Sequence, residues 1–173
     1  MKRFAFAAVA AFGLLAAACA TPQPEPEPDT DTTPIVDTTP DRDPEPAGPT
    51  PGSVEDFEVN AGDRVFYGFD QYTLTNEARA TLRRQAAWLS SYPGVRILIA
   101  GNADERGTRE YNLALGARRA NAARDYLVSQ GVDPARIETV SYGKERPVCR
   151  QSTEECWARN RNATTVIQSG ANS

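Results

Sequence analysis

Four short segments of the chain are rich in β-branched and aromatic residues, a composition that is typical of β-strands. They cover residues 64–69, 95–100, 137–142 and 163–168. Two longer segments repeat apolar residues three or four positions apart in the first and seven positions apart in the second, and both spacings keep the residues on one face of an α-helix. The first helix is predicted at 76–91, with Thr75 as its N-cap, and the second at about 111–130, before Gly131.

The order of these elements along the chain predicts the fold class. A further short helix is predicted near 154–159, in the loop before the last strand. The apolar stripes of the two long helices are Ala78, Leu82, Ala86 and Leu89 in the first, and Leu113, Ala120 and Leu127 in the second. The order β-α-β-α-β-(α)-β indicates an α+β domain of two layers, in which the helices pack on a mixed four-stranded sheet.

The N-terminal segment has the pattern of an export signal. Lys2 and Arg3 precede a short apolar run, which predicts a secretory signal peptide over residues 1–18. The run ends at Cys19 and resembles a bacterial lipobox, in which the cysteine is lipidated and becomes the new N-terminus. Because the next residue is Ala20 and not Asp, the resemblance implies a lipid anchor in the outer membrane of a Gram-negative bacterium, with the domain facing the periplasm. Ordinary cleavage after an Ala-x-Ala pattern is the alternative.

Composition separates the next segment from the rest of the chain. Residues 19–56 hold 10 of the 13 prolines, and with 10 acidic residues and one arginine they carry a charge of −9. Such a segment buries too little apolar surface to offset its chain entropy, so it is predicted to be a disordered spacer. Residues 57–173 carry 13 acidic and 16 basic residues, a charge of +3, and are numerous enough to form a hydrophobic core.

Residue types that are missing exclude several kinds of chemistry. The chain has no histidine, which excludes Ser–His and Cys–His catalysis and zinc sites with histidine ligands. Cys149 and Cys156 lie seven positions apart in a domain predicted to be exported, where oxidising conditions permit a disulfide. Two thiols without histidine do not complete a zinc site, so we expect neither a metal nor another cofactor.

The densest run of polar residues follows the second predicted strand and leads into the second helix. Asn112, Gly116 and Arg119 are spaced so that they share one stripe of that helix. The stripe begins at the helix N-terminus and faces the loop that holds Asp104 and Arg106, and Gly116 is expected to leave it open. Asp104 is then placed to bind an ammonium group and Arg119 a carboxylate, as in a zwitterion. A structural salt bridge between loop and helix is the alternative.

The segment Gly101–Ala120, GNADERGTREYNLALGARRA, resembles the signature of the OmpA-like peptidoglycan-binding domains, especially that of the lipidated members. The resemblance extends over about residues 64–168. It implies non-catalytic binding of the meso-diaminopimelate branch of the peptidoglycan stem peptide, chiefly through Asp104 and Arg119. The other positions that correspond to site or site-shaping residues are Phe69, Asp70, Arg106, Asn112, Leu115 and Arg161. For Leu115, core packing is an equal alternative.

The resemblance also implies a partnership with the Tol complex, through its periplasmic propeller protein, in envelope integrity and cell division. Two residues depart from the family pattern: Asn102 stands where histidine is usual, and Asn162 where arginine is usual. Two other functions are possible. The first is a peptidoglycan hydrolase, with Asp104 and Glu105 as its acid and base. The second is a stator-type wall anchor, which needs a membrane-spanning helix.

Overall fold

The computed structural model describes residues 48–172, so the predicted signal peptide, the lipidation of Cys19 and most of the spacer lie outside the described residues. The strands are β1 (Arg64–Phe66), β2 (Arg96–Asn102), β3 (Ile137–Gly143) and β4 (Asn162–Ser169). The helices are α1 (Val54–Asp56), α2 (Asn76–Ser91), α3 (Arg109–Ser129) and α4 (Glu154–Asn160). A π-helical segment, η1 (Phe57–Ala61), and a 3-10 turn, η2 (Pro134–Arg136), were not predicted.

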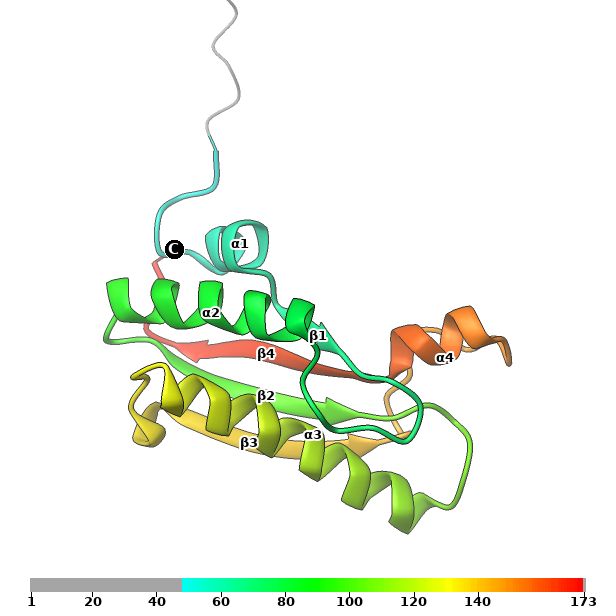
Figure 1. The fold of residues 1–173 in the computed structure, drawn as a ribbon. Helices are drawn as coiled ribbons and strands as arrows, with labels where there is room; N and C mark the ends of the chain where they lie inside the picture. Colours follow the sequence, from blue (N-terminus) through cyan, green and yellow to red (C-terminus); the bar gives the residue numbers. More distant parts are fainter. Residues whose placement is uncertain (1–47, 173) are drawn as a thin grey trace, which may run out of the picture. The chain divides into compact units, whose positions relative to one another are not determined.

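The four strands form one mixed sheet in the order β1-β4-β2-β3. β2 and β3 are parallel, whereas β4 runs antiparallel to both β1 and β2. The long helices α2 and α3 cover one face of this sheet, and α4 stands beyond its end (Figure 1). The predicted α+β fold with a mixed four-stranded sheet is therefore confirmed.

Threonine caps set the starts of both long helices. The hydroxyl of Thr75 accepts a hydrogen bond from the Ala78 amide, so α2 begins and ends where it was predicted. Thr108 caps α3 in the same way, through the amide of Tyr111. The helix therefore begins two residues earlier than the periodicity predicted, because the Arg-Glu pair in its first turn is polar and carries no periodic signal.

Buried residues of α2, β2 and α3 form the centre of the core. The apolar residues among them with no exposed surface are Leu82, Leu89, Ile97, Ile99, Ala120, Ala123 and Leu127. Leu113 was predicted to belong to this core, but it is only half-buried. Residues spaced seven apart drift by about 20° per step around a straight helix. Over the two steps from Leu127 through Ala120 to Leu113, the stripe therefore turns away from the core.

The folded domain begins earlier than residue 57, because the last residues that were assigned to the spacer are part of it. Ser53 caps α1, and the carboxylate of Asp56 accepts hydrogen bonds from the Gly52 amide and from Trp88 Nε1, both at 2.8 Å. The ring of Phe57 then packs edge-on against Trp88 at 5.0 Å. This buried hydrogen bond between the Trp88 indole and the Asp56 carboxylate attaches the segment to α2, and the polar composition of the segment gave no sign of it.

The helix α3 approaches β2 unusually closely at two glycines. A Cβ atom on Gly101 would lie 1.8 Å from the carbonyl oxygen of Gly116. The prediction that Gly116 leaves a polar stripe open was therefore wrong, since this glycine allows the backbones of α3 and β2 to touch. Within residues 48–172, none of the helices has the length and apolar character needed to cross a membrane.

Candidate binding site

A cavity of about 210 Å³ lies at the end of the sheet where β2 finishes and α3 begins. Seven of the eight predicted binding residues line it: Phe69, Asp70, Asp104, Arg106, Asn112, Leu115 and Arg119. The eighth, Arg161, does not. Sequence reasoning missed Ala103, Gly107 and Tyr111, which also line the cavity although they belong to the same polar segment.

Arg119 is the largest fully buried side chain of the domain. Its guanidinium donates to three backbone carbonyls: Nε to Gln71 at 2.8 Å, Nη1 to Asn102 at 2.8 Å and Nη2 to Gly68 at 3.2 Å. It lies over the ring of Tyr67, 5.3 Å from the centroid. Burial lowers the pKa of Arg119 to about 10, so the side chain is still charged at neutral pH.

Two of the three carbonyls that Arg119 holds, those of Gly68 and Gln71, belong to the turn after β1. This explains why β1 ends at Phe66 and not at residue 69: Tyr67 donates one last backbone bond, to the Arg161 carbonyl, and the chain then turns. Asp70 in this turn has a positive φ of 55°, which aspartate tolerates better than most residues. Its carboxylate accepts a hydrogen bond from the Tyr111 hydroxyl. Arg119 thus shapes the part of the cavity wall that carries Asp70.

Asp104 is 5% exposed and is surrounded by donors. Its Oδ1 accepts from the amide and the Nε of Arg106, both at 3.1 Å, and its Oδ2 accepts from Arg106 Nη2 at 2.7 Å and from Arg161 Nη1 at 3.2 Å. No hydrogen bond or ion pair joins Asp104 to Arg119 within the described residues. The salt bridge considered as an alternative exists, but it connects Asp104 to other arginines and not to α3.

Arg161 lies behind the cavity, where it completes a ring of alternating charges. Its Nη1 bonds Asp104, and its Nη2 bonds Glu154 at 2.7 Å. Glu154 lies 3.7 Å from Arg106 Nη1, and Arg106 returns to Asp104. Arg161 is therefore a supporting residue that helps to hold the Asp104 carboxylate in place.

Lowering the pH should weaken this ring. Burial alone would raise the pKa of Asp104, but the hydrogen bonds from Arg106 and Arg161 outweigh it and hold the pKa below its usual value. A carboxylate with a lowered pKa in the folded state stabilises the fold above its unfolded pKa of about 3.9, and that contribution is lost as the pH falls through the folded value. We expect the gap in unfolding free energy between wild type and Asp104→Asn to shrink below about pH 4. Urea titrations from pH 7 to 2 would measure it, and a gap independent of pH would contradict this prediction.

The remaining cavity residues are held by α3 and the neighbouring loops. Asn112 is 2% exposed and donates from Nδ2 to the Arg106 carbonyl at 2.7 Å. Lys144 Nζ donates to the carbonyls of Glu105 and Gly107, which ties the loop after β3 to the loop after β2. Leu115 lines the cavity and lies outside the main core cluster. Its apolar side chain is therefore part of the cavity wall.

The two residues that depart from the family pattern are hydrogen-bonded to each other. Asn102 Nδ2 donates to Asn162 Oδ1 at 2.9 Å across the β2–β4 pair. The side chain of Asn102 is not part of the cavity lining, but its backbone carbonyl accepts from Arg119. Asn102 Oδ1 is buried and has no hydrogen-bond partner among the described residues. Asn102 and Asn162 therefore form one uncharged, hydrogen-bonded pair beneath the site.

A disulfide joins Cys149 and Cys156, whose Cα atoms are 5.1 Å apart. It fastens α4 to the loop before it, and α4 carries two residues that sequence reasoning missed, Glu154 and Trp157. Trp157 is the one aromatic residue of α4, a short helix in which four of the seven residues are charged or amide side chains. An isolated tryptophan in a short polar helix is the signal that would have suggested a specific contact.

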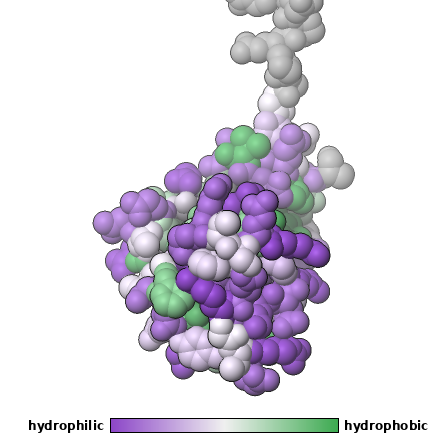
Figure 2. All heavy atoms as spheres, turned by 90° about the vertical axis from the view of Figure 1, so that its right-hand side faces the viewer, coloured by the Kyte–Doolittle hydropathy of each residue, from purple (hydrophilic) through white to green (hydrophobic). Residues whose placement is uncertain are grey.

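The lining of the cavity is electrically balanced, with two acids, Asp70 and Asp104, and two arginines, Arg106 and Arg119. The surrounding end of the molecule is mostly hydrophilic, with small separate hydrophobic patches (Figure 2). Both features suit a small ligand that carries charges of both signs. Among residues 48–172, no three His, Cys, Asp or Glu side chains are grouped so that they could hold a metal ion.

Comparison with known proteins agrees with this fold. A model of the OmpA family matches residues 66–162. The peptidoglycan-associated lipoprotein of Agrobacterium fabrum is 58% identical over 118 residues, which cover 68% of this chain and 67% of that protein. The crystal structure of the peptidoglycan-associated lipoprotein from Burkholderia pseudomallei aligns with a TM-score of 0.62 and 45% identity, over 64% of this chain and 96% of that chain.

This chain belongs to the OmpA family. The resemblance that was based on Gly101–Ala120 is thereby confirmed. The C-terminal domain of MotB from Helicobacter pylori aligns with a TM-score of 0.58 over 62% of this chain and 84% of that chain. It is only 20% identical, so that likeness concerns the fold alone.

Proposed function

We propose that this domain binds peptidoglycan non-covalently, through the meso-diaminopimelate residue of the stem peptide, and does not cleave it. The observation that carries the proposal is the balanced cavity, in which Asp104 and Arg119 line the same space. The free end of meso-diaminopimelate holds an ammonium and a carboxylate on one carbon atom. Two acids and two arginines around a small cavity are complementary to such a group.

The carboxylate of the ligand is assigned to Arg119 and the start of α3. Arg119 uses three of its five N–H groups on backbone carbonyls, so two are left for a ligand. It forms no ion pair with any side chain among the described residues. A buried cation without a carboxylate partner gains most when an anion enters the cavity beside it. Tyr111 and Asn112, in the first turn of α3, line the same cavity, so the dipole of the helix N-terminus also favours an anion there.

The ammonium of the ligand is assigned to Asp104 and Asp70. The lone pairs of Asp104 are already used by arginines, so the ammonium has to replace one of these bonds. Arg106 is the partner that can give up one bond, because it donates to both oxygens of Asp104 and its side chain is 32% exposed, whereas that of Arg161 is 7% exposed. Arg106 then keeps its other bond to Asp104, so the carboxylate stays paired throughout.

The states of the carboxyl groups support binding without cleavage. A glycoside hydrolase needs a carboxyl with a raised pKa as its general acid, but the pKa of Asp104 is lowered. Glu105, the other half of the hypothetical acid–base pair, does not line the cavity and accepts a hydrogen bond from Trp157 Nε1 at 2.9 Å. The lowered pKa of Asp104 and the position of Glu105 favour a non-catalytic binding site over the active site of a hydrolase.

The wider role is to link the outer membrane to the cell wall. A lipid on Cys19 would anchor the chain in the membrane, and the acidic, proline-rich spacer would let the domain reach the wall. The relatives named peptidoglycan-associated lipoproteins support this arrangement. Participation in the Tol system, in contact with its propeller protein, is part of the same proposal and rests on the family resemblance.

Sedimentation with purified sacculi tests the proposal. The Asp104→Asn variant keeps the shape of the side chain but removes the charge that holds an ammonium. We expect its affinity to fall by about tenfold to a hundredfold, which corresponds to about 1.5–3 kcal/mol for a charged hydrogen bond. Asp125→Asn on the exposed face of α3 removes the same charge and should bind as the wild type does. Equal binding by all three proteins would remove the proposed site, and release of soluble muropeptides would favour the hydrolase.

A further inference from the structure

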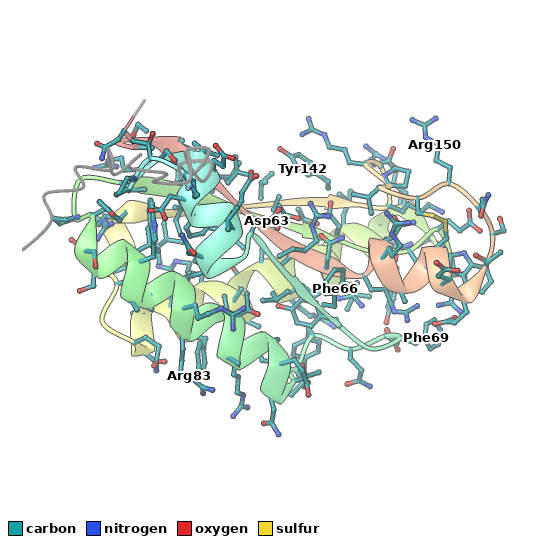
Figure 3. All side chains as sticks on the ribbon, turned by 90° about the horizontal axis from the view of Figure 1, so that it is seen from above. Asp63, Phe66, Phe69, Arg83, Tyr142 and Arg150 are labelled. Atoms are coloured by element: carbon teal, nitrogen blue, oxygen red, sulfur yellow. A yellow bond between two sulfur atoms is a disulfide. The ribbon has the colours of Figure 1, made fainter. Side chains whose placement is uncertain are left out.

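The guanidinium of Arg106 is held on both faces and along its edges. Phe69 lies against one face and Trp157 against the other, with the Arg106 Cζ atom 4.2 Å and 4.1 Å from the two ring centroids. Figure 3 shows Phe69 on the loop after β1, beside α4. One edge of the guanidinium bonds Asp104, and Nη1 lies 3.7 Å from Glu154. Cation–π contact with two rings restricts the guanidinium to one plane.

The helix α4 supplies much of this support without reaching the cavity. Trp157 and Glu154 both belong to α4, and Arg161 follows its last residue. None of the three lines the cavity. Their effect on a ligand therefore passes through the two cavity residues that they contact, Arg106 and Asp104.

The position of α4 depends on few attachments. It has seven residues, too few for a helix that is stable by itself, and it stands beyond the end of the sheet, away from α2 and α3 (Figure 1). The disulfide from Cys156 to Cys149 is its covalent attachment to the loop after β3. The side chain of Asn160 adds hydrogen bonds to the same loop, at the amides of Val148 and Cys149. Without the disulfide, only the chain connection through Arg161 to β4 and non-covalent contacts orient Trp157.

We propose that α4 is a positioning element of the binding site: the Cys149–Cys156 disulfide fixes α4, and Trp157 on α4 holds Arg106 against Asp104. Trp157 is thus a positioning residue that does not touch the ligand. The inference rests on the proposed function for its effect on affinity, but the geometry of Arg106 and Asp104 is a property of the free protein. It can therefore be tested with and without a ligand.

The first test compares the oxidised wild type with the Cys149→Ser/Cys156→Ser variant, without ligand. The pKa of Asp104, followed by NMR of its carboxyl carbon, should rise in the variant toward the ordinary value of about 3.9, because Arg106 no longer holds the carboxylate. The indole N–H signal of Trp157 should move, and that of Trp88, in the core, should not. An unchanged Asp104 pKa with an unchanged Trp157 signal would overturn the inference.

The second test uses a soluble muropeptide that contains meso-diaminopimelate. The double serine variant should bind about tenfold more weakly than the wild type, the size of effect expected when a supporting residue is lost. Trp157→Ala should lose about as much, and Trp157→Phe should recover most of it, since phenylalanine still stacks on Arg106 but cannot donate to Glu105. Equal affinities for the alanine and phenylalanine variants would refute the stacking role. If the wild type itself fails to bind, the proposed function fails, and the ligand-free titration alone decides on α4.

Discussion

Replacing Arg119 with alanine is expected to lower the free energy of unfolding by about 3 kcal/mol, because one buried and two part-buried carbonyl acceptors lose their donor and a fully buried side chain is removed. The carbonyls of Gly68, Gln71 and Asn102 each receive a hydrogen bond from this side chain. Each buried acceptor left without a donor costs about 1–3 kcal/mol, and the removed side chain also leaves a cavity. The alanine variant no longer buries the charge of a guanidinium, and this gain offsets part of the cost.

Urea unfolding of two neighbouring variants measures the effect. Arg118→Ala is the matched control, since Arg118 is exposed and contacts only the Tyr72 ring among aromatic residues, with 5.7 Å to the centroid. We expect that control to change stability by no more than about 0.5 kcal/mol. The stability of Arg119→Lys should fall near that of Arg119→Ala, because one ammonium cannot reproduce the planar fork that reaches carbonyls of both β2 and the turn after β1. Equal stability of the Arg118 and Arg119 alanine variants would contradict this account.

Replacing Gly101 with alanine is the second change with a large expected effect. The new Cβ would lie 1.8 Å from the Gly116 carbonyl oxygen, so α3 has to move away from β2. The atoms nearest to the new Cβ are backbone atoms of Gly116, which cannot move aside as a flexible side chain would. The cost in unfolding free energy should therefore reach the upper part of the range for overpacking, about 3 kcal/mol. The displaced helix carries Asn112, Leu115 and Arg119, so binding to sacculi should be lost as well.

Gly94→Ala provides the control for this experiment. Nothing lies within 4 Å of a Cβ at Gly94, so the same chemical change should alter stability by no more than about 0.5 kcal/mol there. Thermal or urea unfolding gives the stability of both variants, and sedimentation with sacculi gives binding. A Gly101→Ala variant as stable as Gly94→Ala would show that α3 and β2 can separate at no cost.

The long helices and the central strand were predictable because their signals are local. The periodicity of α2 and the threonine at its start are contained within 17 consecutive residues, 75–91, and the structure reproduces both ends. The set of cavity residues was also largely predictable, since the continuous segment 101–120 contributes eight of its ten residues. A polar run between two apolar elements has few places to lie other than the end of the sheet.

The contacts of those residues were not predictable. Arg119 was expected to face Asp104, yet it donates to carbonyls from segments 48 and 51 residues away in the chain. The end of β1 at Phe66 has the same origin, because the turn that follows is held by α3. Trp157 is 52 residues from its hydrogen-bond partner Glu105, and no pattern within a short window contains that information.

Sequence by itself therefore determined the fold class, the membership of the OmpA family and the group of residues that gather at one cavity. These follow from hydrophobic periodicity, capping and a continuous motif, which act over distances of a few residues. Only the tertiary structure decided which donor meets which acceptor: Arg119 with the turn after β1, Asp104 with Arg106 and Arg161, and α4 behind them. A hydrogen bond depends on positions to within a few tenths of an ångström, and those positions are set by packing between segments that are distant in the sequence.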